Sequence, residues 1–160
     1  MELSGVTAYE VFGGITSTIN GRDVCHPVIK SHTVAKMSHV YQPSVHKGGM
    51  LVLMDSSFSN GGDIEDGGVV VVGDGSHCNN IFVAGGTLIV DGGSVNQIML
   101  DTDAKLIVKN GEASFVFGSE FADVEVGELG KLTYCQLIEG AKFANNGGTA
   151  TNVVIAKPIN

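Results

Sequence analysis

The chain has 160 residues, of which 43% are hydrophobic and only 16% charged, and its formal net charge at pH 7 is -8. This composition excludes an intrinsically disordered chain, and the length is sufficient for a single domain with a buried core. The acidic balance also argues against direct binding of nucleic acid or of an anionic membrane, because both carry negative charge, whereas a protein partner with a basic surface is compatible with it.

Residues 1–23 contain neither the basic segment nor the apolar run that opens a secretory signal, and no apolar run in the chain reaches the ~18 residues of a membrane span. The three cysteines, Cys25, Cys78 and Cys135, are odd in number and widely separated, which is not the pattern of a disulfide framework. We therefore expect the protein to lie in the cytoplasm (the host-cell cytoplasm if the chain is phage-encoded), with the cell surface as the alternative. Residues 1–23 are expected to form an N-terminal coil or cap of the domain.

Residues 24–47 are irregular, since they contain no glycine, two prolines and four of the five histidines. They are either an insertion that leaves a regular array or a set of degenerate repeats. The candidate binding residues of this segment are His26, His32, His39 and His46. With Cys25 they could in principle supply zinc ligands, but their spacing matches no known zinc finger, so the sequence predicts no metal site and histidines that gain charge at low pH.

From residue 48 to residue 157 the chain repeats itself every 18 or 19 residues. Two apolar columns carry the repeat. The first contains Leu51, Val70, Leu88, Leu106, Val124 and Phe143, and the second contains Leu53, Val72, Val90, Val108 and Val126. Because the columns are two positions apart, both side chains of a repeat lie on the same face of a short strand. Stacking the repeats would join these pairs into one continuous core.

Glycines and a second apolar segment complete each repeat. Gly67-Gly68 and Gly85-Gly86 open their coils, and Gly75, Gly93 and Gly111 are expected at one shared corner position, where a positive φ is often needed. The second apolar segments are residues 81–83, 98–100, 115–117 and 153–155. No segment has a helical period, so we expect little helix.

These patterns predict an all-β, single-domain β-solenoid over residues 1–160, with about 18–19 residues per coil and a tail at residues 158–160. A β-sandwich would also have short strands, but it would not explain the similarity between strands 18 residues apart. We favour a right-handed coil, because the hexapeptide rhythm of left-handed solenoids is missing.

A family resemblance supports this architecture. The segment NNGGTATNVVIAK (145–157) resembles the GGTATNTTV-type repeat of AIDA-type autotransporter adhesin passengers, and GGTLIVDGGSVNQIML (85–100) is a looser copy. SGVTAYEVFGGITSTINGRD (4–23) resembles the opening coil of such arrays. The resemblance implies a right-handed β-solenoid and, in secreted members, adhesion or self-association, sometimes with glycosylated serine or threonine. The sequence shows neither the signal peptide nor the translocator barrel of those proteins, and it is poorer in serine and threonine.

An outward-facing column lies between the two inward ones. It contains Val52, Val71, Ile89, Ile107 and then Glu125. Four apolar residues on coils ~4.8 Å apart would form a stripe roughly 15–20 Å long. Exposed apolar patches usually mark interfaces, so this stripe is the candidate interface, and a symmetric homo-oligomer is its simplest use. The alternative is that residues 24–47 cover it.

Catalytic motifs are missing from the sequence. It contains no GxSxG elbow, no HExxH and no Walker loop, and the carboxylate pair Asp101/Asp103 and the acidic residues 63–66 are expected at solvated corners. We therefore predict no catalytic residue, no cofactor and no enzymatic activity.

The sequence leaves three functions open. The first is a non-catalytic protein-binding solenoid, for example a phage or mobile-element inhibitor of a host defence complex of the anti-CRISPR type, acting through its acidic surface. The second is an adhesive or structural self-associating module of the autotransporter-passenger type. The third is a small carbohydrate-active β-helix, which would need a groove with clustered carboxylates and aromatic residues.

Overall fold

The computed structural model describes residues 9–11 and 17–157, so the predictions for the first eight residues and for the tail at 158–160 lie outside the described residues. The described part contains strands and turns, and no helix in it is long and apolar enough to cross a membrane. The strands are β1 (Tyr9–Val11), β2 (Ser17–Asn20), β3 (Asp23–Cys25), β4 (Pro27–Ile29), β5 (His32–Lys36), β6 (His39–Tyr41), β7 (Ser44–Val45), β8 (Met50–Met54), β9 (Phe58–Asn60), β10 (Asp63–Glu65), β11 (Val69–Val72), β12 (His77–Ala84), β13 (Thr87–Leu100), β14 (Lys105–Gly118), β15 (Asp123–Ile138), β16 (Lys142–Asn145) and β17 (Thr149–Ala156).

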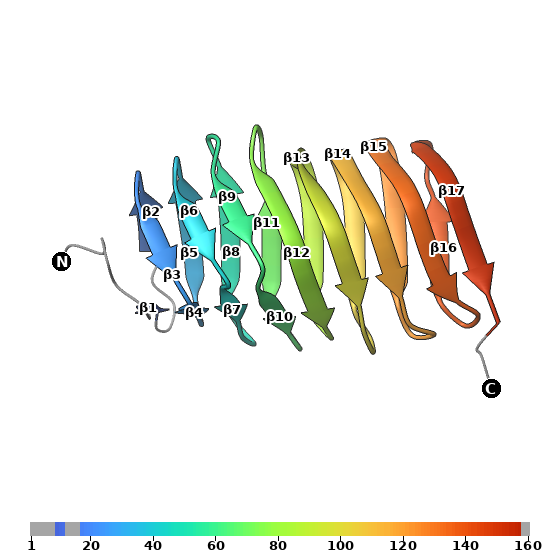
Figure 1. Cartoon of the computed structure of the whole chain (residues 1–160), viewed down its shortest axis with the longest axis horizontal. Helices are drawn as coiled ribbons and strands as arrows, with labels where there is room; N and C mark the ends of the chain where they lie inside the picture. The colour runs from blue at the N-terminus through green and yellow to red at the C-terminus, as the bar shows by residue number, and fades with distance from the viewer. Residues whose placement is uncertain (1–8, 12–16, 158–160) are drawn as a thin grey trace.

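The chain winds into a parallel β-solenoid of about eight turns, which confirms the predicted fold class. All the paired strands are parallel, and each strand between the first and last described turns pairs with the strand one turn earlier and the strand one turn later. In Figure 1 the strands nearer the viewer run downward while the chain advances from left to right, which is a right-handed coil.

Each coil has three faces. Face A is formed by β2, β5, β8 and β11, by the first parts of β13, β14 and β15, and by β16. Face B follows it, with β3, β6 and β9 and the first part of β12. Face C closes the coil, with β1, β4, β7, β10 and the last part of β12. In the later coils β13, β14, β15 and β17 continue from one face to the next.

The core is the two predicted columns of face A together with inward residues of faces B and C. Leu51 pairs with Val70, Val70 with Leu88, and Leu88 with Leu106, and these side chains are fully buried. Within the two predicted columns, Phe143 on the last rung of face A is partly buried. Each side chain therefore packs between its counterparts above and below, which is how a coil too small to have its own core is stabilised.

Residues 24–47 belong to the solenoid and do not form an insertion, because β3 to β7 pair in register with later strands of the same faces. Their period differs from the predicted 18–19 residues: Asp23 pairs with His39, sixteen positions later. The corner between Ile29 and His32 contains two residues where the next coil has four, residues 46–49, so this shorter corner needs no glycine pair.

The glycine pairs occupy corners that exclude a side chain. A Cβ on Gly68 would lie 2.5 Å from the carbonyl oxygen of Val45, and one on Gly86 would lie 2.4 Å from Ile64 Cγ2. The predicted alignment of Gly75 with Gly93 is wrong by one residue. The pairing of His77 with Ser94 places Gly93 beside Ser76, because the corner of the later coil is one residue shorter.

Candidate interaction surfaces

Face A carries the predicted stripe. Val52 pairs with Val71, Val71 with Ile89 and Ile89 with Ile107, and Glu125 ends the row. All five side chains are half-buried, because β-branched neighbours on adjacent rungs shield one another. The stripe begins one coil earlier, at Val34 of β5. Residues 24–47 therefore extend the stripe and do not cover it, and its use as an interface stays a prediction.

The four histidines of residues 24–47 lie on different sides of the solenoid. His26 is at the corner between faces B and C, His32 is on face A, and His39 is on face B. His46 Nδ1 lies 2.8 Å from Glu65 Oε2, and His39 Nδ1 lies 3.3 Å from Asp23 Oδ1. They do not converge, and the described residues contain no group of three or more His, Cys, Asp or Glu side chains that could hold a metal.

At the corner between faces B and C, each described coil has one residue in the left-handed backbone conformation, with positive φ. This left-handed corner column contains His26, Gln42, Gly61, Asn80, Gln97, Phe115, Tyr134 and Asn152, with φ between 49° and 73°. Only one of them is glycine, and a positive φ costs other residues roughly 1–2 kcal/mol. In the early coils the backbone N–H of the corner residue donates to the next coil, for example from Gln42 to the Asn60 carbonyl at 2.8 Å.

Two of these corner residues are large aromatics. Phe115 and Tyr134 are 45% and 52% exposed, and their rings stack with centroids 5.1 Å apart and planes 11° from parallel. A bulky side chain at positive φ is uncommon, and strained residues of this kind cluster at functional sites. The strain and the exposure together make this pair the strongest functional candidate in the described part of the molecule.

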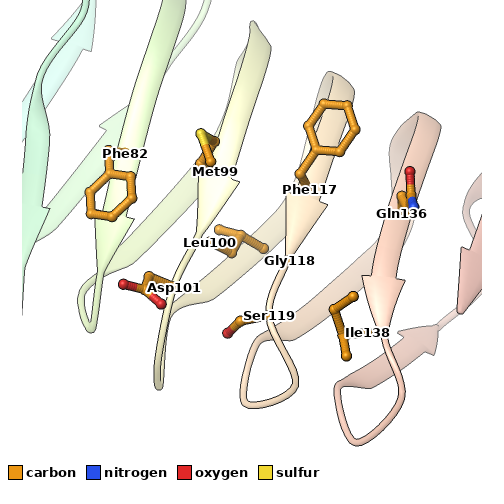
Figure 2. A pocket seen from close by; sticks show the side chains of 9 residues that line it. All are labelled: Phe82, Met99, Leu100, Asp101, Phe117, Gly118, Ser119, Gln136 and Ile138. Atoms are coloured by element: carbon orange, nitrogen blue, oxygen red, sulfur yellow. The ribbon is translucent and has the colours of Figure 1, made fainter. Parts of the chain in front are cut away.

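A second exposed column runs beside this corner, on face C. This outer column contains Phe82, Met99, Phe117, Gln136 and Val154. Met99, Phe117 and Val154 are 56%, 47% and 55% exposed. Figure 2 shows the first four of these side chains in a row on neighbouring strands, where they and Asp101 line a hollow of about 390 Å³.

Two further hollows lie between the outer column and the left-handed corner column. One, of about 370 Å³, is lined by residues from Asn80 to Phe117, and the other, of about 560 Å³, is lined by residues from Phe115 to Val154. They share Phe117, so together they form one groove parallel to the solenoid axis, which we call the corner groove. The lining residues of both hollows are uncharged.

Sequence reasoning missed this surface because it took residues 115–117 as one strand. In the structure Gln97 and Phe115 occupy equivalent corner positions with positive φ, and Val116 lies in the core, where it pairs with Ile98. The positive φ of Phe115 shifts the alternation of the strand by one residue, so that the buried residues Ala113 and Val116 are three positions apart and Phe115 and Phe117 both face solvent. The signal that could have revealed it is the polar residue before the other segments, as at Asn80 and Asn152.

A fourth hollow, on face B, contains a hydroxyl group beside an imidazole. Ser94 Oγ and His77 Nδ1 form a hydrogen bond in a space of about 330 Å³. Glu112 lines the same hollow, but it lies 3.8 Å from Lys131 Nζ. Within the described residues no carboxylate is placed to orient the imidazole, so the pair lacks the third member of a nucleophilic triad.

The three free thiols differ in environment. Burial raises the pKa of the Cys78 thiol to about 12, although hydrogen bonds to Ser59 and the Asn79 backbone partly oppose this, and burial raises the pKa of Cys135 to about 11. Cys25 is half-buried. A thiol reagent at pH 8 is expected to modify Cys25 alone, and to modify Cys78 and Cys135 only after denaturation, as mass spectrometry of the labelled protein would show.

The same thiols make stability fall in alkali. Unfolded thiols lose their protons near pH 9, whereas the buried ones keep theirs until pH 11 or 12. Their contribution is complete below pH 9 and declines as the pH rises toward the folded pKa values, by about 1.4 kcal/mol per pH unit for each thiol. Urea unfolding of the native protein and of a Cys78→Ala/Cys135→Ala variant, each at pH 8 and pH 10, would measure this loss of stability. If the free energy of unfolding changed equally with pH in both proteins, the thiols would not be the cause.

Comparisons with known proteins agree with the geometry. No family model matches the chain, and no curated protein matches it. Among solved structures, it is similar to the crystal structure of a TibA fragment whose hyper-glycosylation is catalysed by TibC, with a TM-score of 0.83 and 17% sequence identity. The match covers 94% of this chain and 60% of that one. The likeness shows that both chains have the same β-solenoid fold.

Proposed function

We propose that the chain is a non-enzymatic, self-associating module of the adhesive type. The observation that carries the proposal is the concentration of exposed apolar side chains on one side of the later coils, where Met99, Phe115, Phe117, Tyr134 and Val154 are each about half exposed. Contiguous exposed apolar residues on a rigid body are typical of a surface that another macromolecule covers.

The family resemblance and the fold support the same proposal. The repeat at 145–157 resembles AIDA-type passengers, in which adhesion or self-association is the expected role, and the chain shares its fold with the TibA fragment. The hyper-glycosylation by TibC is a property of that fragment and is not assigned to this chain. On this proposal the chain works at a cell surface, the alternative location to the cytoplasm.

The other two functions have less in their favour. No observation favours an inhibitor that acts through an acidic surface, and several carboxylates lie close to bases of neighbouring coils, such as Asp123 beside Lys105 at 4.0 Å. A carbohydrate-active site would need two carboxylates facing one cleft. The hollow of Figure 2 contains one, Asp101.

The test is to replace the aromatic pair with asparagine. The double variant Phe115→Asn/Tyr134→Asn keeps a residue that tolerates positive φ and that already stands in this column at Asn80 and Asn152. We expect the native protein to self-associate in sedimentation velocity experiments at micromolar concentration. The variant should need at least ~100-fold more protein, since each buried aromatic anchor contributes about 1–2 kcal/mol or more.

A matched control is the variant Val71→Thr/Ile89→Thr, which reduces the apolar area of the face A stripe while keeping β-branched side chains. It should self-associate like the native protein, and circular dichroism should show the same β-structure in all three proteins. A native protein that stays monomeric at every accessible concentration would contradict the proposed function. Loss of association in the face A variant alone would move the interface to the predicted stripe.

A further inference from the structure

We infer that the corner groove receives the outer column of face C from a second copy of the same chain, and that the two solenoids lie parallel, with equal coils side by side. The inference rests on the proposed self-association and adds the contact surface, the occupant and the orientation. On the surface of the later coils, a ridge and a groove lie next to each other along the same coils.

The ridge is the outer column, in which Phe82, Met99 and Phe117 follow one another on adjacent rungs. The groove lies on the side of this ridge toward face B, with Phe115 and Tyr134 as its opposite wall. The surface therefore offers both halves of a contact: an apolar row that needs to be covered, and an apolar channel of similar length that can receive such a row.

Symmetry decides the orientation. A two-fold axis parallel to the solenoid axis exchanges the two sides of the ridge, so that each ridge enters the other copy's groove. A two-fold axis perpendicular to the solenoid axis places the ridge of one copy against the ridge of the other and leaves both grooves empty. Reciprocal insertion thus requires parallel solenoids, in which each coil lies beside the same coil of the second copy.

Charge favours the same arrangement. The residues that line the corner groove are uncharged, so inserting an apolar row there buries no unpaired charge. Beyond the ridge, the corner between faces C and A carries a row of exposed acids: Asp101, Asp103, Glu120 and Glu139. An antiparallel pair would set two such rows side by side, whereas a parallel pair sets each row beside face B, whose outer column holds the ion pair of Glu112 and Lys131.

The available area is that of a small stable dimer. An aromatic side chain has roughly 150–250 Å² of surface, so five large side chains that are about half exposed offer roughly 400–500 Å² of apolar area. A standard interface buries about 800 Å² per partner, of which somewhat over half is apolar. The amides of Asn80, Gln97, Gln136 and Asn152 stand around this apolar centre and would form its polar rim.

Ring geometry argues against a flat ligand as the occupant. Because Phe115 and Tyr134 stack on each other at 5.1 Å, each has one face covered by the other ring. Sugar rings and nucleobases bind aromatic residues mainly through ring faces. The ring edges and the row beside them suit an irregular apolar surface, which another copy of the outer column provides.

The orientation can be measured with spin labels near the two ends of the corner column. In a Cys25→Ser background, the variants Gln42→Cys and Thr151→Cys each give one accessible thiol, since Cys78 and Cys135 are buried and neither labelled residue lines the groove. Gln42 lies four coils before the coil of Phe115, and Thr151 lies two coils after it. Pulsed electron–electron double resonance on each labelled, self-associated protein then gives the distance between a label and the same label on the second copy.

A parallel pair predicts similar, short distances for both labels, and loss of both distances on adding Phe115→Asn/Tyr134→Asn. An antiparallel pair centred on Phe115 predicts axial separations of about 38 Å for Gln42 and about 19 Å for Thr151, because rungs are ~4.8 Å apart. That difference, or equal long distances that survive the double variant, would overturn the inference while leaving self-association intact. Absence of any association would instead overturn the proposed function.

Discussion

Replacing Gly130 with alanine is expected to destabilise the solenoid by about 3 kcal/mol or more. A Cβ at this position would lie 2.1 Å from the carbonyl oxygen of Val108, which belongs to the backbone of the preceding coil. The clash cannot be relieved by rotating a side chain, so two rungs must separate and their hydrogen bonds must lengthen. Urea unfolding followed by circular dichroism would measure the loss of stability.

Gly127 is the matched control, because it lies three residues earlier in the same turn and its φ, like that of Gly130, is outside the left-handed range. A Cβ on Gly127 would lie 3.4 Å from the Lys109 carbonyl oxygen, which is ordinary contact. Gly127→Ala should therefore change stability by no more than about 1 kcal/mol in either direction. Equal losses in the two variants would show that the close approach to Val108 is not the cause.

The second large effect is expected in the middle of the core, with Leu88→Ala. Leu88 is fully buried and pairs with Val70 on one side and Leu106 on the other. Removing three carbon atoms leaves a cavity between these two side chains, and the backbone ladders on both sides prevent the coils from collapsing into it. We expect the free energy of unfolding to fall by about 2–5 kcal/mol.

The neighbouring variant Ile89→Ala separates core packing from strand propensity. Ile89 stands on the same strand but faces outward and is half-buried. Its loss should cost less than about 1.5 kcal/mol, because only a partly buried side chain is removed. Unfolding of both variants by the same denaturant would compare them, and an Ile89→Ala effect as large as that of Leu88→Ala would mean that face A is covered in solution.

Face A could be predicted from the sequence because its residues obey one simple rule. Leu51, Val52 and Leu53 alternate inward and outward, and the same alternation returns at a constant spacing in coil after coil, so an apolar column is visible without any structure. The first coils do not follow this rule. Their period is sixteen residues, and residues 24–47 contain no glycine to mark the corners, so this segment could be recognised only by its pairing with later strands.

The aromatic corner could not be predicted by the same rule. In a strand Phe115 and Phe117 share one face, and nothing in the alternation places Phe115 at a corner with positive φ. The corner conformation is imposed by the neighbouring coils, whose carbonyl groups accept the hydrogen bonds of corner N–H groups such as that of Gln42. Such a constraint is tertiary, so a rule based on local periodicity does not detect it.

The left-handed corner column gives the solenoid one position per coil at which the side chain is free to vary. The column already accepts histidine, glutamine, glycine, asparagine, phenylalanine and tyrosine with nearly the same backbone, so the fold does not depend on which residue stands there. The coil spacing of ~4.8 Å is also close to the stacking distance of aromatic rings. A row of rings along this edge could therefore be lengthened by one ring per substitution, at Gln97 or Asn152, which would give the molecule a binding surface of adjustable length on an unchanged scaffold.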